Sequence, residues 1–284
     1  MPIFSIGFPC KVATERVIAS FCSVLGAAIR EDAEIIVGIQ DIIDSDPKIV
    51  DFLSRQPRTR VVYTNAYSNL SGTLNHIISN SNGRYFIRTD DDDFMHPLRV
   101  SKLHEVIKNG IDFAILGQAY KCFAHDRLGP LVTPATKSID NKMKLLLGVP
   151  FGHPAITIDL SKIGQNPYDV NQVYAQDYML YVNMIKKGSY LGFDHLATYY
   201  RLPTNATSSQ MQKRRRQLND HERAMRMLWN KLSPINITSE QIHILRSTLV
   251  TSEFADMDIK NQKRWCFNML KEGSNLLRDY IGDA

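Results

Sequence analysis

Four consecutive carboxylates, Asp90 to Asp93, are the residues of this sequence with the clearest potential for chemistry. They follow the apolar run 85–87, which predicts a strand, and precede a helix predicted to begin near Pro97. In open α/β sheets, ligands bind beyond the carboxyl ends of such strands. Adjacent carboxylates repel one another unless a cation lies among them, and Mg²⁺ and Mn²⁺ bridge carboxylates to substrate phosphates. The run therefore predicts a metal–phosphate site, with a solvated acidic loop or an acid-stabilised helix N-terminus as the alternative.

The elements that position these acids alternate between strands and helices. Apolar runs predict strands, and apolar residues at helical spacing predict helices. Up to residue 116, the predicted strands are 3–8, 34–39, 60–63, 85–89 and 112–116, and the predicted helices are 14–28, 47–54, 71–79 and 97–108. This alternation favours a parallel sheet with helices on both faces.

The pattern becomes less regular after residue 118 and is helical after about residue 208. The middle part predicts a hairpin at 119–131, a helix at 140–147, a strand at 151–158, a helix at 176–187 and short strands at 190–193 and 197–201. The last part predicts helices at 218–232, 239–250 and 260–280, with Ser239 as a cap. The chain therefore combines an α/β body with a helical tail.

The composition is that of an ordinary globular protein. The 284 residues allow one large domain or one domain plus an appendage, and 44% of them are hydrophobic and 22% charged. No apolar run approaches the ~20 residues needed to span a bilayer, and the first residues do not read as a signal peptide. We therefore expect a cytoplasmic protein with free thiols.

The positive charge is concentrated near the end of the chain. The formal net charge is +5, and residues 205–284 contain 13 Lys and Arg against 9 Asp and Glu, an excess of four. The densest run is Lys213-Arg214-Arg215-Arg216. This asymmetry favours contact with an anionic membrane surface or an acidic partner, and a solvated basic helix face is the alternative.

Two ordered sets of residues recur together in a known family. The first set is Ser71-Gly72-Thr73-Leu74-Asn75, Asn82-Gly83-Arg84-Tyr85-Phe86-Ile87-Arg88-Thr89-Asp90-Asp91-Asp92-Asp93, Pro97 and Arg99. The second set is His153-Pro154, Gln176-Asp177-Tyr178, Gly188 and Tyr200-Arg201. In this order and at these spacings, over about residues 3–208, the sequence resembles the family 2 glycosyltransferases with the GT-A fold.

The resemblance implies a fold and a division of the chain. The fold is α/β and Rossmann-like, with a mostly parallel central sheet, flanking helices and a C-terminal helical extension. The GT-A domain would occupy residues 1–207, with a nucleotide-sugar-binding half at about 1–118 and an acceptor-binding half at about 119–207. The helical extension would occupy residues 208–284.

The resemblance also implies an activity. A metal-dependent, inverting glycosyltransferase of the hexosyltransferase type would move a sugar from a nucleotide diphosphate sugar, expected to be a UDP-sugar, to an acceptor hydroxyl. The expected setting is bacterial surface polysaccharide synthesis: O-antigen, lipopolysaccharide or capsule. Its partners would be the donor, a glycan or lipid-linked glycan acceptor and Mn²⁺ or Mg²⁺, without nucleic acid. Its basic C-terminal region would contact the inner face of the cytoplasmic membrane.

The matched positions imply a role for each site residue. Asp177 would be the catalytic base, and a helix cap is its alternative role. The metal would be held by Asp90, Asp92 and Asp93. The spacing does not decide which of these three acids are ligands of the metal. The acceptor would meet His153 and Gln176. The donor would meet Pro9, Gln40, Asp41, Asn75, Arg88, Asp90, Asp91 and Arg201.

Two other functions are compatible with acids beside a sheet. A nucleotidyltransferase normally has a glycine-rich phosphate loop after the first strand, and the segment 8–12 lacks one. A non-catalytic metal- or glycan-binding module would be indicated by loss of the base, whereas Asp177 is present. The sequence also departs from the family pattern, since Gln40-Asp41 replaces a pair of acids and Leu202-Pro203 replaces a histidine that completes the metal shell.

Overall fold

A computed structural model describes residues 2–64, 69–124, 127–202, 208–233, 236–247 and 259–282. The strands are β1 (Phe4–Cys10), β2 (Ala33–Ile39), β3 (Thr59–Tyr63), β4 (Tyr85–Arg88), β5 (Phe94–Met95), β6 (Ile115–Ala124), β7 (Arg127–Val132), β8 (Ile156–Asp159) and β9 (Tyr190–Arg201). The α-helices are α1 (Ile18–Ile29), α2 (Pro47–Ser54), α3 (Leu70–Ser79), α4 (Arg99–Lys108), α5 (Ser138–Lys144), α6 (Leu160–Ile163), α7 (Gln176–Met184), α8 (Ser208–Leu232), α9 (Ser239–Arg246) and α10 (Ile259–Ile281). Short 3-10 helices precede α1 at Glu15–Val17 and β8 at His153–Ala155.

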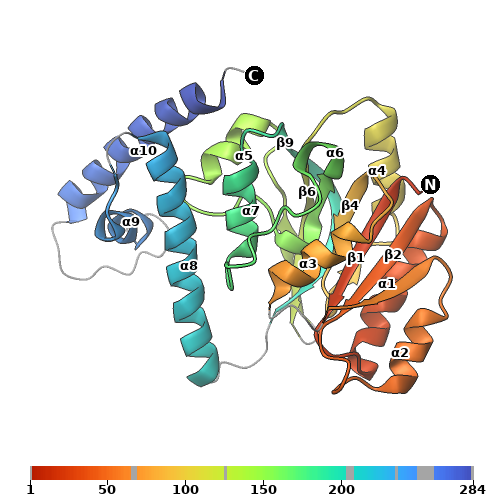
Figure 1. The fold of residues 1–284 in the computed structure, drawn as a ribbon. Coiled ribbons are helices and arrows are strands. Elements are labelled where there is room, and N and C mark those ends of the chain that lie inside the picture. The colour runs from red at the N-terminus through yellow and green to blue at the C-terminus, as the bar shows by residue number, and fades with distance from the viewer. Residues whose placement is uncertain are drawn as a thin grey trace.

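The described strands form one mixed sheet in the order β3-β2-β1-β4-β8-β6-β9-β5, with β7 paired to β6 (Figure 1). The predicted parallel pairing is confirmed for β3-β2-β1-β4. Beyond β4, β8 runs antiparallel to both of its neighbours, while β6 and β9 are parallel. The antiparallel pairs therefore begin where the sequence loses its strand–helix alternation.

The sheet has an apolar core on each face because side chains alternate along its strands. On one face, Phe4, Ile6 and Phe8 of β1 pack beneath α1, α2 and α4. On the other face, Ile36 of β2 and Phe86 of β4 join α3, α7 and the C-terminal helices. The two layers of helices hold the carboxyl ends of β1, β2 and β4 at a common edge of the sheet.

Close packing of α3 depends on two glycines of the sheet. A Cβ atom at Gly7 would lie 2.2 Å from the Phe86 ring, and one at Gly38 would lie 2.7 Å from Ile77 of α3. Contacts this short do not occur between real Cβ atoms and their neighbours, so the Phe86 ring of β4 can pack over β1, and α3 over β2, only because both residues lack side chains. The approach brings the N-terminus of α3 next to the end of β2.

Several predicted boundaries differ from those of the structure. The strands predicted at 190–193 and 197–201 form one continuous strand, β9. Only residues 115–116 of the strand predicted at 112–116 are in a strand; they begin the long strand β6, which pairs antiparallel with β7 in the region of the predicted hairpin. Pro9 does not end β1, because it still pairs in register with Gly38 of the neighbouring strand. Thr238, rather than Ser239, caps α9 through a reciprocal contact with Gln241. The predicted end of that helix at residue 250 lies outside the described residues.

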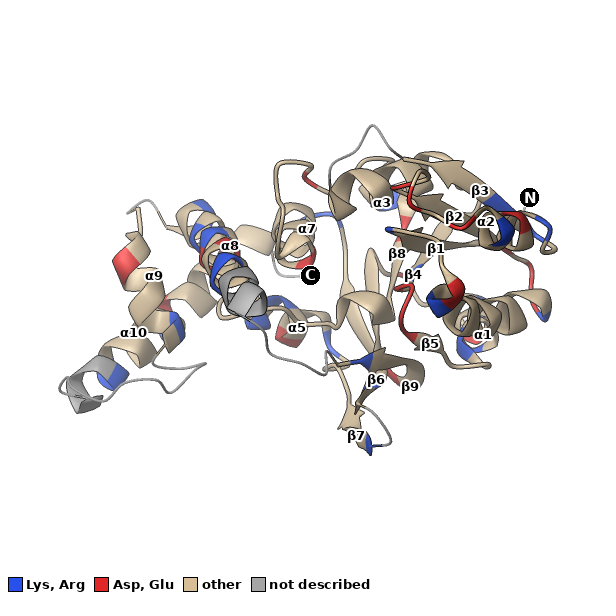
Figure 2. Ribbon diagram, turned by 90° about the horizontal axis from the view of Figure 1, so that it is seen from below, with Lys and Arg blue, Asp and Glu red and all other residues tan. Residues whose placement is uncertain are grey.

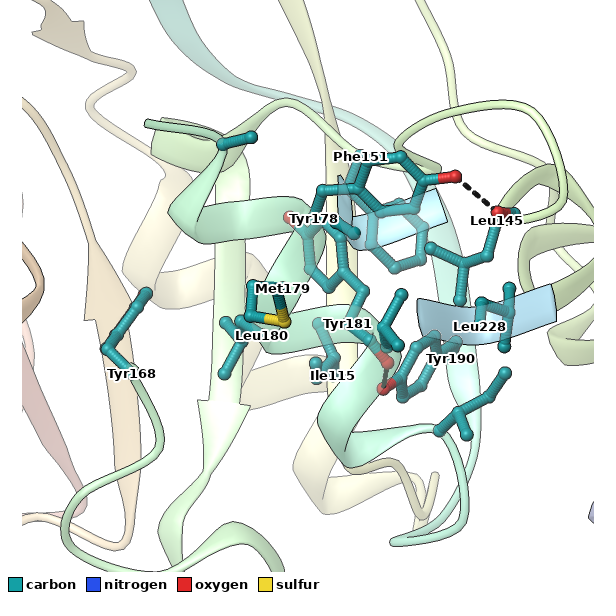
Figure 3. Close-up of a cluster of buried hydrophobic side chains, with 14 of the residues drawn as sticks. Ile115, Leu145, Phe151, Tyr168, Tyr178, Met179, Leu180, Tyr181, Tyr190 and Leu228 are labelled. Atoms are coloured by element: carbon teal, nitrogen blue, oxygen red, sulfur yellow. Dashed lines mark hydrogen bonds between the residues drawn. The ribbon is translucent and has the colours of Figure 1, made fainter. Parts of the chain in front are cut away.

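The C-terminal helices pack against the α/β body through α8, which lies beside α7 (Figure 1). Leu228 of α8 belongs to the same buried cluster as Leu145, Tyr178 and Tyr190 (Figure 3). The indole of Trp229 donates to the backbone oxygen of Leu146 at 3.1 Å. The helical extension therefore shares a core with the body. Within the described residues, no helix is long and apolar enough to cross a membrane.

Candidate active site

The acid run follows β4, as the sequence predicted, and forms the acid turn that leads into the short strand β5, which the sequence did not predict. Oxygen atoms of Asp90, Asp92 and Asp93 all lie within 4.8 Å of one another. Asp93 is fully buried, Asp90 is about one quarter exposed at 25%, and Asp92 is exposed. Three carboxylates this close can converge on one cation.

Arg88, at the end of β4, is the cation nearest to these acids. Its side chain is 2% exposed and forms an ion pair with Asp90. Burial by itself would lower the Arg88 pKa, but the Asp90 carboxylate outweighs burial and raises that pKa. The guanidinium therefore stays charged, and its Nε atom has no hydrogen-bond partner among the described residues.

The electrostatics of the acid turn fit a divalent cation. Burial, followed by the charge of Asp90, raises the pKa of Asp93 to about 8. The same two causes raise the pKa of Asp91 to about 6. The buried Oδ2 atom of Asp93 has no hydrogen-bond partner among the described residues. A buried carboxylate oxygen without a partner is costly, and the hard oxygen ligands of this turn suit Mg²⁺ or Mn²⁺.

Arg201, the last residue of β9, fixes the backbone of the acid turn. Its amide donates to Asp93 Oδ1 at 2.8 Å, and its Nε donates to the backbone oxygen of Asp92 at 2.9 Å. The guanidinium also lies 4.6 Å from the centroid of the Phe123 ring, within range of a cation–π contact. Arg201 thus connects the acid turn to the far half of the sheet.

A cleft of about 1160 Å³ extends from the acid turn to the start of α7. Its volume is ample for a ligand larger than a typical drug molecule. Six of the predicted site residues line it: Gln40, Arg88, Asp90, His153, Gln176 and Asp177. The structure therefore brings one acid of the run, Asp90, into a single cavity with the predicted base Asp177, 87 positions later in the sequence (177 − 90). Asp92 and Asp93, the other predicted metal ligands, do not line the described cleft.

Asp177 lies in the first turn of α7, after Ala175 in the left-handed conformation with φ 52°. Its Oδ1 atom accepts a hydrogen bond from the amide of Tyr178 at 2.8 Å. Burial raises the pKa of Asp177, and His221 of α8 opposes that rise. The carboxylate is half-buried in the wall of the cleft, in reach of a bound molecule.

His153 is held as a neutral imidazole in the same wall. Burial, aided by the charge of Arg88, lowers its pKa well below the usual 6.5. Its Nε2 atom lies 2.9 Å from the hydroxyl of Tyr168. The other predicted acceptor residue, Gln176, donates from its side chain to the backbone oxygen of Val173.

The remaining predicted donor residues lie near the cleft but do not line it within the described part of the chain. Asn75 is buried and exchanges two hydrogen bonds with the backbone of Tyr168, at 2.8 and 3.0 Å. Asp41 accepts from the amide of Asp44 at 3.1 Å, and Asp91 lies beside the Cys10 thiol. Pro9 is buried inside the sheet, and Arg201 contacts the acid turn as described above.

The cleft also contains residues that the sequence did not single out. Lys11 lies at the end near β1, and Gln217 and His221 enter from α8, beyond the matched motifs. The spacing of four between these last two places them on one face of a helix. Nothing in the sequence pattern indicates that this face meets the cleft, because the contact depends on how α8 packs.

Comparisons with known proteins agree with the fold. The family model described as glycosyl transferase family 2 matches residues 5–158, which is 154 of 284 residues. No curated protein matches the chain. Among solved structures, S. aureus TarS 1-349 is 13% identical with a TM-score of 0.62, and the alignment covers 99% of this chain and 82% of that one. The chain spans 49% of a longer S. aureus TarS structure, with 12% identity and a TM-score of 0.60.

A third solved structure is the mannosyltransferase PcManGT from Pyrobaculum calidifontis in complex with GDP-Man and Mn²⁺. It is 11% identical with a TM-score of 0.58, and the alignment covers 99% of this chain and 85% of that one. Identities this low establish the fold alone, which is the predicted α/β GT-A type. The match of the family model over more than half of the residues establishes that the chain belongs to glycosyl transferase family 2.

Proposed function

We propose that this protein is an inverting glycosyltransferase that moves a sugar from a nucleotide diphosphate sugar to an acceptor hydroxyl. The observation that carries the proposal is that one cleft is lined both by Arg88 and Asp90, at and just after the end of β4, and by Asp177, in the first turn of α7. Transfer needs positive charge where the diphosphate leaves and a base where the acceptor attacks. The cleft supplies both: Arg88 carries positive charge, and Asp177 is a carboxylate that can act as the base.

At the diphosphate end, Asp90, Asp92 and Asp93 would hold Mn²⁺ or Mg²⁺. When bound, such an ion neutralises the negative charge that develops on the leaving diphosphate. Arg88 and Lys11 line this end and add positive charge, and a guanidinium fork matches phosphate oxygens.

At the other end, Asp177 would accept the proton of the acceptor hydroxyl. The acceptor oxygen forms its bond to the anomeric carbon as the bond to the diphosphate breaks, and the electron pair leaves with the diphosphate. A positioned base contributes about 10²–10⁴-fold to such a step. A single displacement inverts the anomeric carbon, so NMR of the product should show a configuration opposite to that of the donor.

The donor is proposed to be a UDP-sugar. One solved TarS structure contains UDP-GlcNAc, whereas PcManGT contains GDP-Man, so relatives of this fold bind nucleotide sugars with different bases. A thermal-shift screen with UDP, GDP, CDP and dTDP in the presence of Mn²⁺ tests the choice, because a ligand that binds only the native state raises its stability. If another nucleotide gave a larger shift in melting temperature than UDP, that nucleotide would replace UDP in the proposed donor.

The acceptor is proposed to be a glycan or lipid-linked glycan of a bacterial surface polysaccharide, reached at the inner face of the cytoplasmic membrane. Lysine and arginine residues recur along the ribbon of α8 (Figure 2), and Arg215 and Arg216 are exposed. A basic helix gains about 1 kcal/mol for each such residue near an anionic lipid surface. Sedimentation with vesicles containing anionic lipid, for the native protein and an Arg215→Gln/Arg216→Gln variant, tests this contact.

The central experiment measures sugar transfer from a panel of nucleotide sugars with Mn²⁺, for the native protein and for Asp177→Asn. The change removes the proposed base and keeps a side chain of similar size. We expect transfer by the native protein and a loss of about 10²–10⁴-fold in the variant. Equal rates for the two proteins would refute the assignment of the base, and no transfer from any donor would refute the function.

A further inference from the structure

The C-terminal helix α8 is attached to the segment that carries Asp177. Asp220 accepts a hydrogen bond from the amide of Tyr174 at 3.0 Å, three residues before Asp177. At the other end of α8, Trp229 donates to the backbone of Leu146, and a Cβ at Gly273 of α10 would lie 2.3 Å from the Trp229 ring. The position of α8 on the α/β body is therefore fixed at two points, Tyr174 and Leu146, and α10 packs closely against Trp229.

This attachment brings His221 to the wall of the cleft. The residue follows the anchor Asp220, and its ring centroid lies 5.6 Å from that of Tyr178, the neighbour of Asp177. Both His221 and Asp177 line the cleft, and both are half-buried. An imidazole and a carboxylate thus share one corner of the site, although they come from different helices.

We propose that His221 is a positioning residue that acts on the reaction through Asp177, whose ionised form it favours from the same wall of the cleft. This inference rests on the proposed function, in which Asp177 is the base. It assigns to the C-terminal helices a part in the reaction rather than a purely structural one. The family match ends at residue 158, so this part of the site is not within the matched region.

The electrostatics of the corner support the proposal. Burial pushes the pKa of Asp177 upward, His221 is the strongest influence in the opposite direction, and Arg88 of β4 is the other charged side chain that lowers this pKa. Burial lowers the pKa of His221 overall, and Asp177 is the strongest influence that opposes this fall. The other charged groups that act on His221 are Arg246 of α9, which lowers its pKa, and Asp220, which raises it.

The interaction between His221 and Asp177 can be tested without any assay of activity. NMR titration of the imidazole signals should show a lower pKa for His221 in Asp177→Asn than in the native protein, because the variant lacks the carboxylate. His221→Gln identifies the signal among the eight histidines. His243, which lies 2.9 Å from Glu222 and does not line the cleft, is the control residue whose signal should not respond to the substitution. An unchanged His221 pKa in Asp177→Asn would overturn the proposal, whether or not the protein transfers sugar.

The role in the reaction is tested by comparing His221→Gln with His243→Gln, a matched change at an exposed site that does not line the cleft. In His221→Gln, the acidic limb of the profile of kcat against pH should move to higher pH. A movement of about one pKa unit lowers kcat about tenfold on that limb. KM for the donor and the thermal shift with UDP should stay as in the native protein, as should all constants of His243→Gln.

The possible results separate the two proposals. An altered His221 pKa together with a displaced acidic limb supports both. A native acidic limb in His221→Gln overturns the positioning role, while loss of activity in Asp177→Asn leaves the proposed function in place. If Asp177→Asn transfers sugar at the native rate, the base assignment fails, and the role of His221 fails with it even if the two side chains interact.

Discussion

The buried Arg99 on α4 gives the sharpest test of how the cleft is supported. Its side chain has no exposed surface, and its three donors reach Gln118 Oε1 at 3.1 Å, Pro154 O at 2.9 Å and Ile156 O at 3.0 Å. These bonds tie the segment after His153 to the sheet. The planar fork of arginine makes all three possible, and no lysine ammonium can reproduce that geometry.

We expect Arg99→Lys to destabilise the protein by about 2–6 kcal/mol. The change keeps the charge but leaves two buried acceptors without their donor, and each costs about 1–3 kcal/mol. Burial already lowers the pKa of Arg99 to about 9, and a buried lysine is still more easily neutralised. The measurement is the free energy of unfolding in urea for the native protein and the variant.

Arg55→Lys is the matched control for this change. Arg55 is exposed and pairs with Asp51 one helical turn away at 2.8 Å, so we expect its change to cost less than about 0.5 kcal/mol. If Arg99→Lys unfolded at the same urea concentration as Arg55→Lys, the three hydrogen bonds would contribute nothing measurable. The account of Arg99 as the support of the 154–156 segment would then be wrong.

Three further outcomes follow from the packing and the pKa shifts. Gly7→Ala should lower the free energy of unfolding by about 1–3 kcal/mol, because the new Cβ would overlap Phe86. Gly26→Ala is the control: a Cβ there has nothing within 4 Å, so stability should stay the same or rise by up to about 1 kcal/mol. Urea unfolding of the two variants checks this. Trp229→Ala should cost about 3–5 kcal/mol by the same measurement, and a cost near zero would show that α8 packs differently. Folding lowers the pKa of His153, so as the pH falls below about 6.5 the unfolded state takes up the proton on this residue before the folded state does. The native protein should therefore lose stability relative to His153→Gln by up to about 1.4 kcal/mol per pH unit. Parallel curves of unfolding free energy against pH for the two proteins, from about pH 7 to about pH 5, would contradict this.

The first half of the chain could be predicted from the sequence because local signals there agree with the packing. Helix α2 was predicted at its observed bounds, since Pro47 lies at its start and the Asp46 side chain accepts from the amide of Lys48. The acid turn was predicted because a buried strand leads directly into it. Each of these elements depends on residues that are neighbours in the sequence.

The second half required the structure because its contacts are distant in the sequence. The continuity of β9 depends on pairing with β6, some 75 residues earlier at Ile115 and Tyr190, and not on its own alternation. Asn75 matched a donor-site motif, yet its amide holds the Tyr168 backbone 93 residues away. His221 has no motif of its own and reaches the cleft only because α8 packs on α7. Contacts between residues this far apart in the sequence depend on how whole elements pack, and local sequence patterns do not show that packing.

The wall formed by α8 has a consequence for the order in which the protein becomes competent during synthesis. A nascent chain that has emerged as far as Arg201 already contains all the acids of the cleft, but nothing yet occupies the side that Gln217 and His221 will cover. The amide of Tyr174 also lacks its hydrogen-bond acceptor until Asp220 has been synthesised. The groups assigned to the donor and the base are therefore synthesised before α8, and the wall of the cleft beside Asp177 is complete only once α8 has docked.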